Sequence, residues 1–89
     1  MNLNSLVNTS LSEADGVFTL KNENTTLGFV RFNYDGEVEY IFVNPLFRNK
    51  NLAKKLLKLV RKKTGKKIVF QEPISPLGFK LLKSIERWN

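Results

Sequence analysis

Short runs of apolar, β-branched and aromatic residues, separated by turn residues, fill the first half of the chain and predict β-strands. The runs are Val17–Leu20, Leu27–Phe32 and Glu37–Val43. The segment Asn33–Gly36 contains the Asp-Gly step that is typical of a tight hairpin. We therefore expect these three strands to form an antiparallel meander.

The second half of the chain changes to a helical period. From Asn49 to Lys63 the apolar residues recur on one face and lysines occupy the rest of the wheel, which predicts an amphipathic helix packed on the sheet. Gly65 ends this helix. The expected inward positions are Leu52, Leu56, Leu59 and Val60, with Leu57 at the margin.

A last strand and helix complete the predicted domain. Lys67–Gln71 is the fourth strand, and a right-handed crossover places it parallel to Glu37–Val43. Ser75 and Pro76 have the character of an N-cap and a first helical residue. The residues expected to face inward, as core, are Leu77, Phe79, Leu81, Leu82, Ile85 and Trp88.

The predicted fold class is α+β, with the element order β-β-β-α-β-α. At 89 residues the chain has room for one domain. We assign residues 16–89 to that domain and expect residues 1–15, rich in Asn and Ser, to be loose or to form one short helix.

Composition removes several kinds of chemistry. The chain has no Cys and no His, so thiol nucleophiles and the commonest metal ligands are absent, and we expect no metal. A general base must then be a carboxylate, an amine, a Tyr or a bound water. No apolar run approaches the roughly 20 residues that span a bilayer, and no secretory signal is evident, so we expect a cytoplasmic protein without a membrane partner.

The net charge of +7 is divided unevenly along the chain. Residues 1–47 carry a net charge of −4 and residues 48–89 a net charge of +11. Such a basic face attracts phosphate, either of a nucleotide cofactor or of nucleic acid. A solubilising helix surface is the alternative interpretation of the outer lysines, Lys55, Lys58, Lys62 and Lys63.

The loop between Val43 and the basic helix has the chemistry of an anion site. A helix N-terminus carries unpaired N–H groups and a partial positive charge, and Arg48, Lys50 and Lys54 add full charges beside it. Asn51 precedes the helix, and Asn tolerates a positive φ better than other residues with a side chain. A plain strand-to-helix turn is the alternative interpretation.

This stretch resembles the acyl-coenzyme A-binding motif of the GNAT (Gcn5-related) N-acetyltransferases. Val43, Pro45, Phe47, Arg48 and Ala53 fall in register with the family pattern, and Asn51 stands at its first Gly position. The resemblance covers about residues 16–88 and is closest to the minimal, small members of the family. It implies that the usual N-terminal strand and helix pair are missing.

The resemblance also implies acetyl-coenzyme A as the acyl donor, lying between two parallel strands that separate. Phe42 and Val43 would bind pantetheine, the backbone from Arg48 to Ala53 the pyrophosphate, and Lys50 or Lys54 the adenosine phosphate. The implied cofactor-binding residues are Phe42, Val43, Arg48, Asn49, Lys50, Asn51, Leu52, Ala53 and Lys54.

Two glutamates are candidate catalytic bases. Glu37 is the first candidate, because it lies six residues before Val43, the offset of the catalytic Glu in Gcn5-type enzymes. Glu39 shares its side of the strand by alternation and is the substitute candidate. Both are equally compatible with solvent-facing strand residues, and Arg31 is positioned to pair with one of them across the hairpin. The family's usual Tyr on the last helix is absent.

The predicted function is acetyl-coenzyme A-dependent N-acetylation of a primary amine, with a protein lysine favoured because an open acceptor side suits a large substrate. A homodimer that closes this side is the alternative arrangement. Two other functions remain open, a catalytically silent GNAT-like protein-binding module and a basic nucleic-acid-binding domain.

Overall fold

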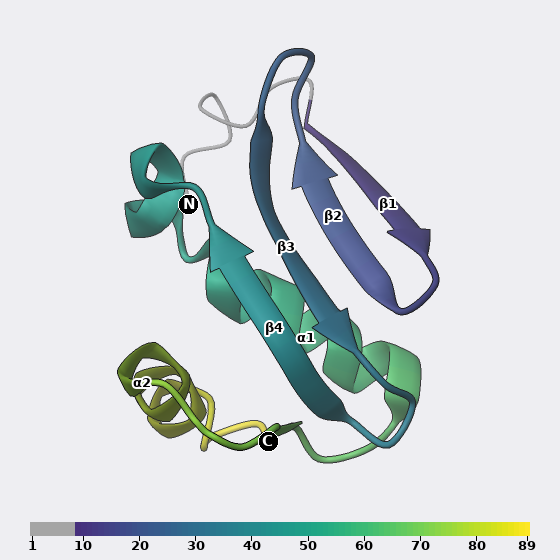
Figure 1. Ribbon diagram of the computed structural model, residues 1–89, viewed down its shortest axis with the longest axis vertical. Coiled ribbons are helices and arrows are strands. Elements are labelled where there is room, and N and C mark those ends of the chain that lie inside the picture. Colours follow the sequence, from purple (N-terminus) through teal and green to yellow (C-terminus); the bar gives the residue numbers. More distant parts are fainter. Residues whose placement is uncertain (1–8) are drawn as a thin grey trace.

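The computed structural model describes residues 9–89 and has the predicted α+β architecture. Five strands form one sheet in the order β1-β2-β3-β4-β5. The elements are β1 (Ser10–Ala14), β2 (Val17–Lys21), β3 (Thr26–Phe32), β4 (Glu37–Val43), η2 (Pro45–Lys50), α1 (Leu52–Thr64), β5 (Val69–Phe70) and α2 (Pro76–Ser84). Figure 1 shows α1 crossing one face of the sheet and α2 lying on the β4 side.

The sheet begins one strand earlier than predicted. Ser10–Ala14 pairs antiparallel with β2, where we expected a loose segment or a short helix, while residues 1–8 lie outside the described part of the chain. Asp15 and Gly16, with φ of 52° and 78°, connect the strands, and positive φ at both residues suits a two-residue hairpin turn. An N-terminal strand is therefore present, contrary to the prediction, and it turns into β2 without a helix pair.

Strands β2, β3 and β4 form the predicted antiparallel meander. The register shifts near the end of β3, where Arg31 lies opposite Tyr40 and Phe32 opposite Val38. Glu39 is thus an extra residue in β4, which defines a β-bulge. The parallel strand β5 is shorter than the predicted 67–71, because only Val69 and Phe70 pair with β4.

The helix α1 starts later than the sequence predicts. Its first residue is Leu52, since Pro45–Lys50 forms the separate 3-10 helix η2. Gly65, at φ 66°, ends α1 as predicted. The prediction that Leu57 is marginal is wrong, because Leu57 is fully buried while Leu59 is only partly buried.

The helix α2 starts as predicted, because the Ser75 hydroxyl accepts a hydrogen bond from the Gly78 N–H at 3.1 Å. Of its apolar side chains Leu81 is buried and Leu82 is partly buried against the core, and Ile85, directly after the helix, is fully buried. The predictions for Leu77 and Phe79 are wrong, because these side chains are 48% and 61% exposed. The sheet that would cover α2 is narrow here, since β5 pairs with β4 over only two residues.

The core lies between α1 and one face of the sheet. Its buried side chains are Phe18, Leu20, Leu27, Val30, Phe32, Val38, Val43, Leu52, Leu56, Leu57, Val60, Ile68, Leu81 and Ile85. Trp88 packs against this cluster from the C-terminal turn, as predicted. Within residues 9–89, no helix is both long and apolar enough to cross a membrane.

Candidate functional site

Strand β4 has an open edge beyond its first two residues. Its pairing with β5 covers Glu37 and Val38, and the Gln71 N–H donates to the Val38 carbonyl at 2.8 Å. From Glu39 to Val43 no described strand runs along this edge. The two parallel strands therefore separate, as the resemblance predicts, and backbone groups on this side of β4 are available to a ligand.

Asn51 forms the junction between η2 and α1. Its φ of 57° and ψ of 28° are left-handed, which confirms that this position needs a positive φ. The Asn51 side chain makes no capping hydrogen bond, and the first turn of α1 contains no acidic residue. The first N–H groups of α1 therefore lack a side-chain cap, and the end of the helix is suited to an anion.

A cavity of about 510 Å³ joins the open edge of β4 to the start of α1. We call it the strand-edge cavity. Its lining residues come from β4, η2, α1 and α2, and they are Tyr40, Ile41, Phe42, Val43, Arg48, Asn51, Ala53, Lys54, Leu77 and Leu81. Apolar side chains and free strand edge dominate one end, and Arg48 and Lys54 bring positive charge to the other.

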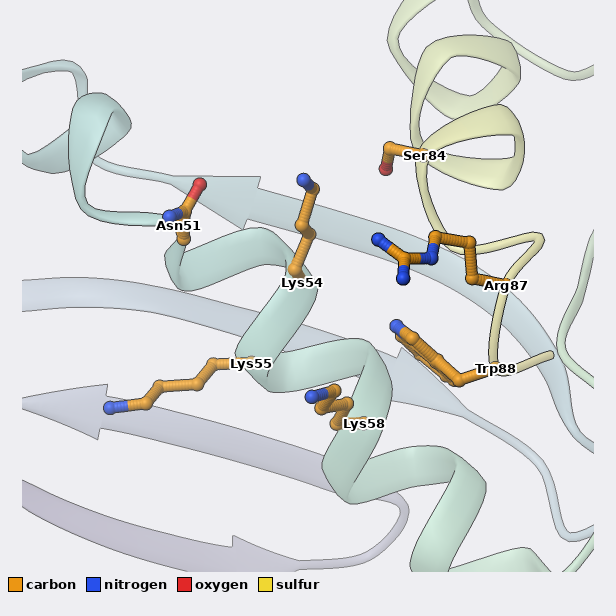
Figure 2. Close-up of a pocket in the computed structure, with 7 residues that line it drawn as sticks. All are labelled: Asn51, Lys54, Lys55, Lys58, Ser84, Arg87 and Trp88. Carbon is orange, nitrogen blue, oxygen red and sulfur yellow. The ribbon is translucent and has the colours of Figure 1, made fainter. Parts of the chain in front are cut away.

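A second cavity, of about 590 Å³, lies between α1 and the C-terminal end of α2. This interhelix pocket is lined by Asn51, Lys54, Lys55, Lys58, Ser84, Arg87 and Trp88, without an acidic side chain. Figure 2 shows Lys54 of α1 and Arg87 of the C-terminal turn extending into the same space, with Ser84 above them. The Lys58 ammonium lies 5.8 Å from the centre of the Trp88 ring. The pocket is strongly cationic.

A third, smaller cavity of about 200 Å³ occupies the gap where β4 and the chain after β5 separate. We call it the splay cavity. Its lining residues are Val38, Glu39, Tyr40, Ile41, Phe70, Gln71, Pro73, Ile74, Ser75 and Leu77. It shares Tyr40, Ile41 and Leu77 with the strand-edge cavity, which in turn shares Asn51 and Lys54 with the interhelix pocket. The three cavities are therefore neighbours that follow one another from β4 to α1, and we refer to this series as the path.

Most of the predicted cofactor residues come together along this path. Phe42, Val43, Arg48, Asn51, Ala53 and Lys54 all line the strand-edge cavity. Leu52 is 1% exposed, so its side chain belongs to the core, and Leu52 lines none of the three cavities. Asn49 and Lys50 belong to η2, and their side chains lie outside the described part of the structure.

The two candidate bases occupy different surroundings. Asn33 donates to the Glu37 carboxylate at 3.0 Å inside the hairpin, and Glu37 lines none of the three cavities. Glu39 lines the splay cavity and forms an ion pair with Arg31 at 3.4 Å, as predicted for one of the two glutamates. Of the two carboxylates, Glu39 is the one placed at a cavity.

Sequence reasoning missed three groups on the path, namely Tyr40, Arg87 and the Lys58–Trp88 pair. It considered Ser84 only as a proton donor acting through water, with an exposed helix position as the favoured interpretation. No local signal identifies Arg87, because its relation to α1 depends on how α2 packs. Tyr40 carried a partial signal, an aromatic residue with a hydroxyl three positions before Val43. Metal ligands are not clustered, since residues 9–89 contain no group of three or more Asp or Glu side chains suited to a metal ion.

Comparison with protein families matches residues 4–71 to the model of the acetyltransferase (GNAT) family. This match covers more than half of the chain and its strands β1 to β5, so the protein belongs to the GNAT family. The five-stranded mixed sheet with two helices is a minimal form of that fold. No curated protein and no solved structure gives a match.

Proposed function

We propose that this protein transfers an acetyl group from acetyl-coenzyme A to a primary amine. One observation carries the proposal: the strand-edge cavity and the interhelix pocket lie next to each other, with Asn51 and Lys54 in the lining of both. One end of the path is an apolar slot beside a free strand edge, and the other end is a cationic pocket. Acetyl-coenzyme A has the same order of parts, a narrow pantetheine arm followed by phosphates.

The residues present fit this donor. The open edge of β4 at Phe42 and Val43 offers backbone partners to the pantetheine amides. Arg48 and the uncapped start of α1 suit the pyrophosphate. Lys54 and Arg87 suit the remaining phosphate. When bound, the donor supplies a thioester whose carbonyl carbon accepts a nucleophile.

The splay cavity suits the acceptor. At about 200 Å³ it is small, and Ile41, Phe70 and Leu77 line it with apolar surface beside the Glu39 carboxylate. An unbranched aliphatic stem with an amine head, such as a lysine side chain, matches these properties. Because a free lysine, at pKa about 10.4, is almost fully protonated at neutral pH, a base is needed, and Glu39 accepts that proton. A lysine of a protein is the proposed acceptor.

Calorimetry with coenzyme A, followed by acetylation assays on lysine peptides, tests the proposal. Wild-type protein should bind coenzyme A, and Arg87→Glu should weaken binding by about tenfold because it places a carboxylate in the cationic pocket. The matched control is Lys62→Glu, an exposed charge reversal on α1 that lines none of the three cavities. Equal affinity in both variants, or no binding by the wild type, would contradict the proposed path.

A second candidate function is coenzyme binding without transfer. This function is favoured because both candidate bases already have partners within the protein: Glu37 accepts from Asn33, and Glu39 pairs with Arg31. Coenzyme A binding in calorimetry combined with no acetylation of any peptide or small amine would support this silent module over the enzyme.

A further inference from the structure

We propose that Tyr40 is the general acid that protonates the sulfur of the departing coenzyme A. This inference rests on the proposed function. The family's usual Tyr on the last helix is absent from this chain, and both tyrosines, Tyr34 and Tyr40, lie before α1. The structure places one of them where the acyl donor and the acceptor would meet.

Tyr40 lies at the junction of two cavities. The strand-edge cavity and the splay cavity share Tyr40, Ile41 and Leu77. Of these three residues, only Tyr40 has a side chain that can donate a proton. If the pantetheine arm occupies the first cavity and the amine the second, the reacting atoms meet at this junction.

The β-bulge explains why Tyr40 is available there. Glu39 is inserted between the residues of β4 that pair with Arg31 and Phe32. Consequently Glu39 and Tyr40 are both exposed, although neighbouring strand residues normally point to opposite faces. The pairing of β4 with β5 ends at Val38, one residue before the bulge. No described strand therefore lies beside Tyr40 on the β5 side. The bulge therefore presents a carboxylate and a phenol next to each other.

The Tyr40 ring is held in place while its hydroxyl remains accessible. The ring stacks on Phe29, with centroids 5.6 Å apart and planes 22° apart, and Phe29 in turn contacts Phe42 at 5.4 Å. The residue is 56% exposed. Stacking thus fixes the direction of the ring without a hydrogen bond that would occupy the hydroxyl.

Other proton donors on the path are less well placed. Ser75 lines the splay cavity, but its hydroxyl caps α2 by accepting from Gly78. Arg48 and Lys54 lie at the phosphate end of the strand-edge cavity, with the first turn of α1. Tyr34 is in the hairpin, where its hydroxyl lies 3.5 Å from the Glu13 carboxylate. Tyr40 is the donor that the geometry favours.

The proton balance of the step is complete with these residues and water. The amine nitrogen loses two protons, one to Glu39 and one to water, as the carbon–nitrogen bond forms. Tyr40 donates its hydroxyl proton to sulfur as the carbon–sulfur bond breaks and leaves its electron pair on sulfur. Glu39 then releases its proton to water and Tyr40 regains one, so each ammonium acetylated releases one proton.

Binding of coenzyme A and of desulfo-coenzyme A, which lacks the sulfur, tests this assignment without turnover. Wild-type protein should prefer coenzyme A, because the Tyr40 hydroxyl contacts the sulfur. In Tyr40→Phe, which keeps the stacked ring, affinity for coenzyme A should fall about three- to tenfold, as expected for one hydrogen bond. Affinity for the desulfo compound should not change. Tyr34→Phe is the matched control and should resemble wild type with both ligands.

The outcomes separate this inference from the proposed function. Coenzyme A binding that is the same in wild type and Tyr40→Phe overturns the role of Tyr40 and leaves the proposed cofactor path intact. No binding of either compound by wild type overturns both. In the steady state, Tyr40→Phe should lower kcat about 10- to 100-fold, because the sulfur then leaves without a proton donor. An unchanged kcat overturns the inference.

Discussion

The two ends of strand β4 differ in what lies beside them. At its start, Glu37 and Val38 pair with β5, Val38 is 1% exposed, and the Glu37 carboxylate accepts from Asn33. After the bulge at Glu39, β4 still pairs with β3, but its other edge borders two cavities instead of a neighbouring strand. At the closed end, the backbone groups and the Glu37 carboxylate have partners within the protein. At the open end, backbone and side-chain groups are available to a ligand.

This difference within the seven residues of β4 shows how one strand of a small domain can stabilise the fold at one end and form a binding site at the other. The closed end anchors β5, and through it α2, to the sheet. The bulge then stops the pairing pattern, so the open end is not covered by β5. Changes at the closed end should therefore alter stability, and changes at the open end should alter binding and turnover.

The largest contrast is expected between the two glutamates. Glu39→Gln keeps the shape of the side chain but removes its basicity, so kcat should fall by about 10²–10⁴, the usual contribution of a general base. Glu37→Gln should retain activity within about threefold, because the amide can still bond within the hairpin. Peptide acetylation assays measure both. The reverse ranking would return the catalytic role to Glu37 and break the comparison of the two ends.

The Glu39→Gln defect should also depend on pH. At high pH more of the lysine acceptor is neutral before it binds, so part of the lost rate should return as pH rises toward the amine pKa of about 10.4. A defect that is constant over the whole pH range would argue that Glu39 orients the acceptor through Arg31 rather than accepting its proton.

The next largest effect is expected at the phosphate end of the open half. Arg48→Glu should weaken binding of coenzyme A by about 30- to 150-fold, because a charge-assisted contact becomes a repulsion. Calorimetry checks this value. Lys62→Glu, with the same change of charge on an exposed part of α1, should change the affinity by less than about threefold. Equal losses would indicate that overall charge, not the cavity, attracts the ligand.

The closed half is tested by the same substitution at two valines, one in each of the paired strands β4 and β5. Val38→Ala in β4 should lower the free energy of unfolding by about 2 kcal/mol, because it leaves a cavity in the core. Val69→Ala in β5 should cost less than about 1 kcal/mol, since Val69 is 47% exposed. Urea unfolding measures both. Coenzyme A affinity of the folded Val38→Ala protein should match wild type, and a large loss would mean that the two ends are coupled.

Much of the closed architecture was predictable from local patterns. Apolar runs, the Asp35–Gly36 hairpin, the helical period of α1 and the Ser75 cap each depend on neighbours in sequence. Strand β1 was missed because all five of its residues are exposed and show no alternation. The same Asp-Gly signal was present at Asp15–Gly16, and it should have indicated a hairpin there.

The open site was predictable only in part. The basic loop and the positive φ of Asn51 follow from local chemistry, and the structure agrees with both. The bulge that separates Glu37 from Glu39 depends on pairing with β3, which alternation along one strand cannot reveal. Arg87 joins Lys54 only because α2 packs beside α1. These features arise from tertiary packing.

The smallest effect is expected at Asn51, where the open half of β4 leads through η2 into α1. Its side chain makes no capping bond, and its left-handed backbone is the conformation that Gly adopts most readily. Asn51→Gly should therefore change the free energy of unfolding by less than about 0.5 kcal/mol. Gly adopts the positive φ with less strain, which stabilises the folded state, but it also makes the unfolded chain more flexible, and the two effects offset each other. Coenzyme A should bind as tightly, or up to about threefold more tightly.

Asn51→Ala is the control, because Ala also removes the side chain but resists a positive φ. It should cost about 1 kcal/mol of stability and weaken coenzyme A binding, since the start of α1 would shift to relieve strain. If Asn51→Gly instead lost affinity as strongly as Asn51→Ala, the Asn51 amide itself would be a ligand contact. The site would then depend on the Asn51 side chain as well as on its backbone conformation.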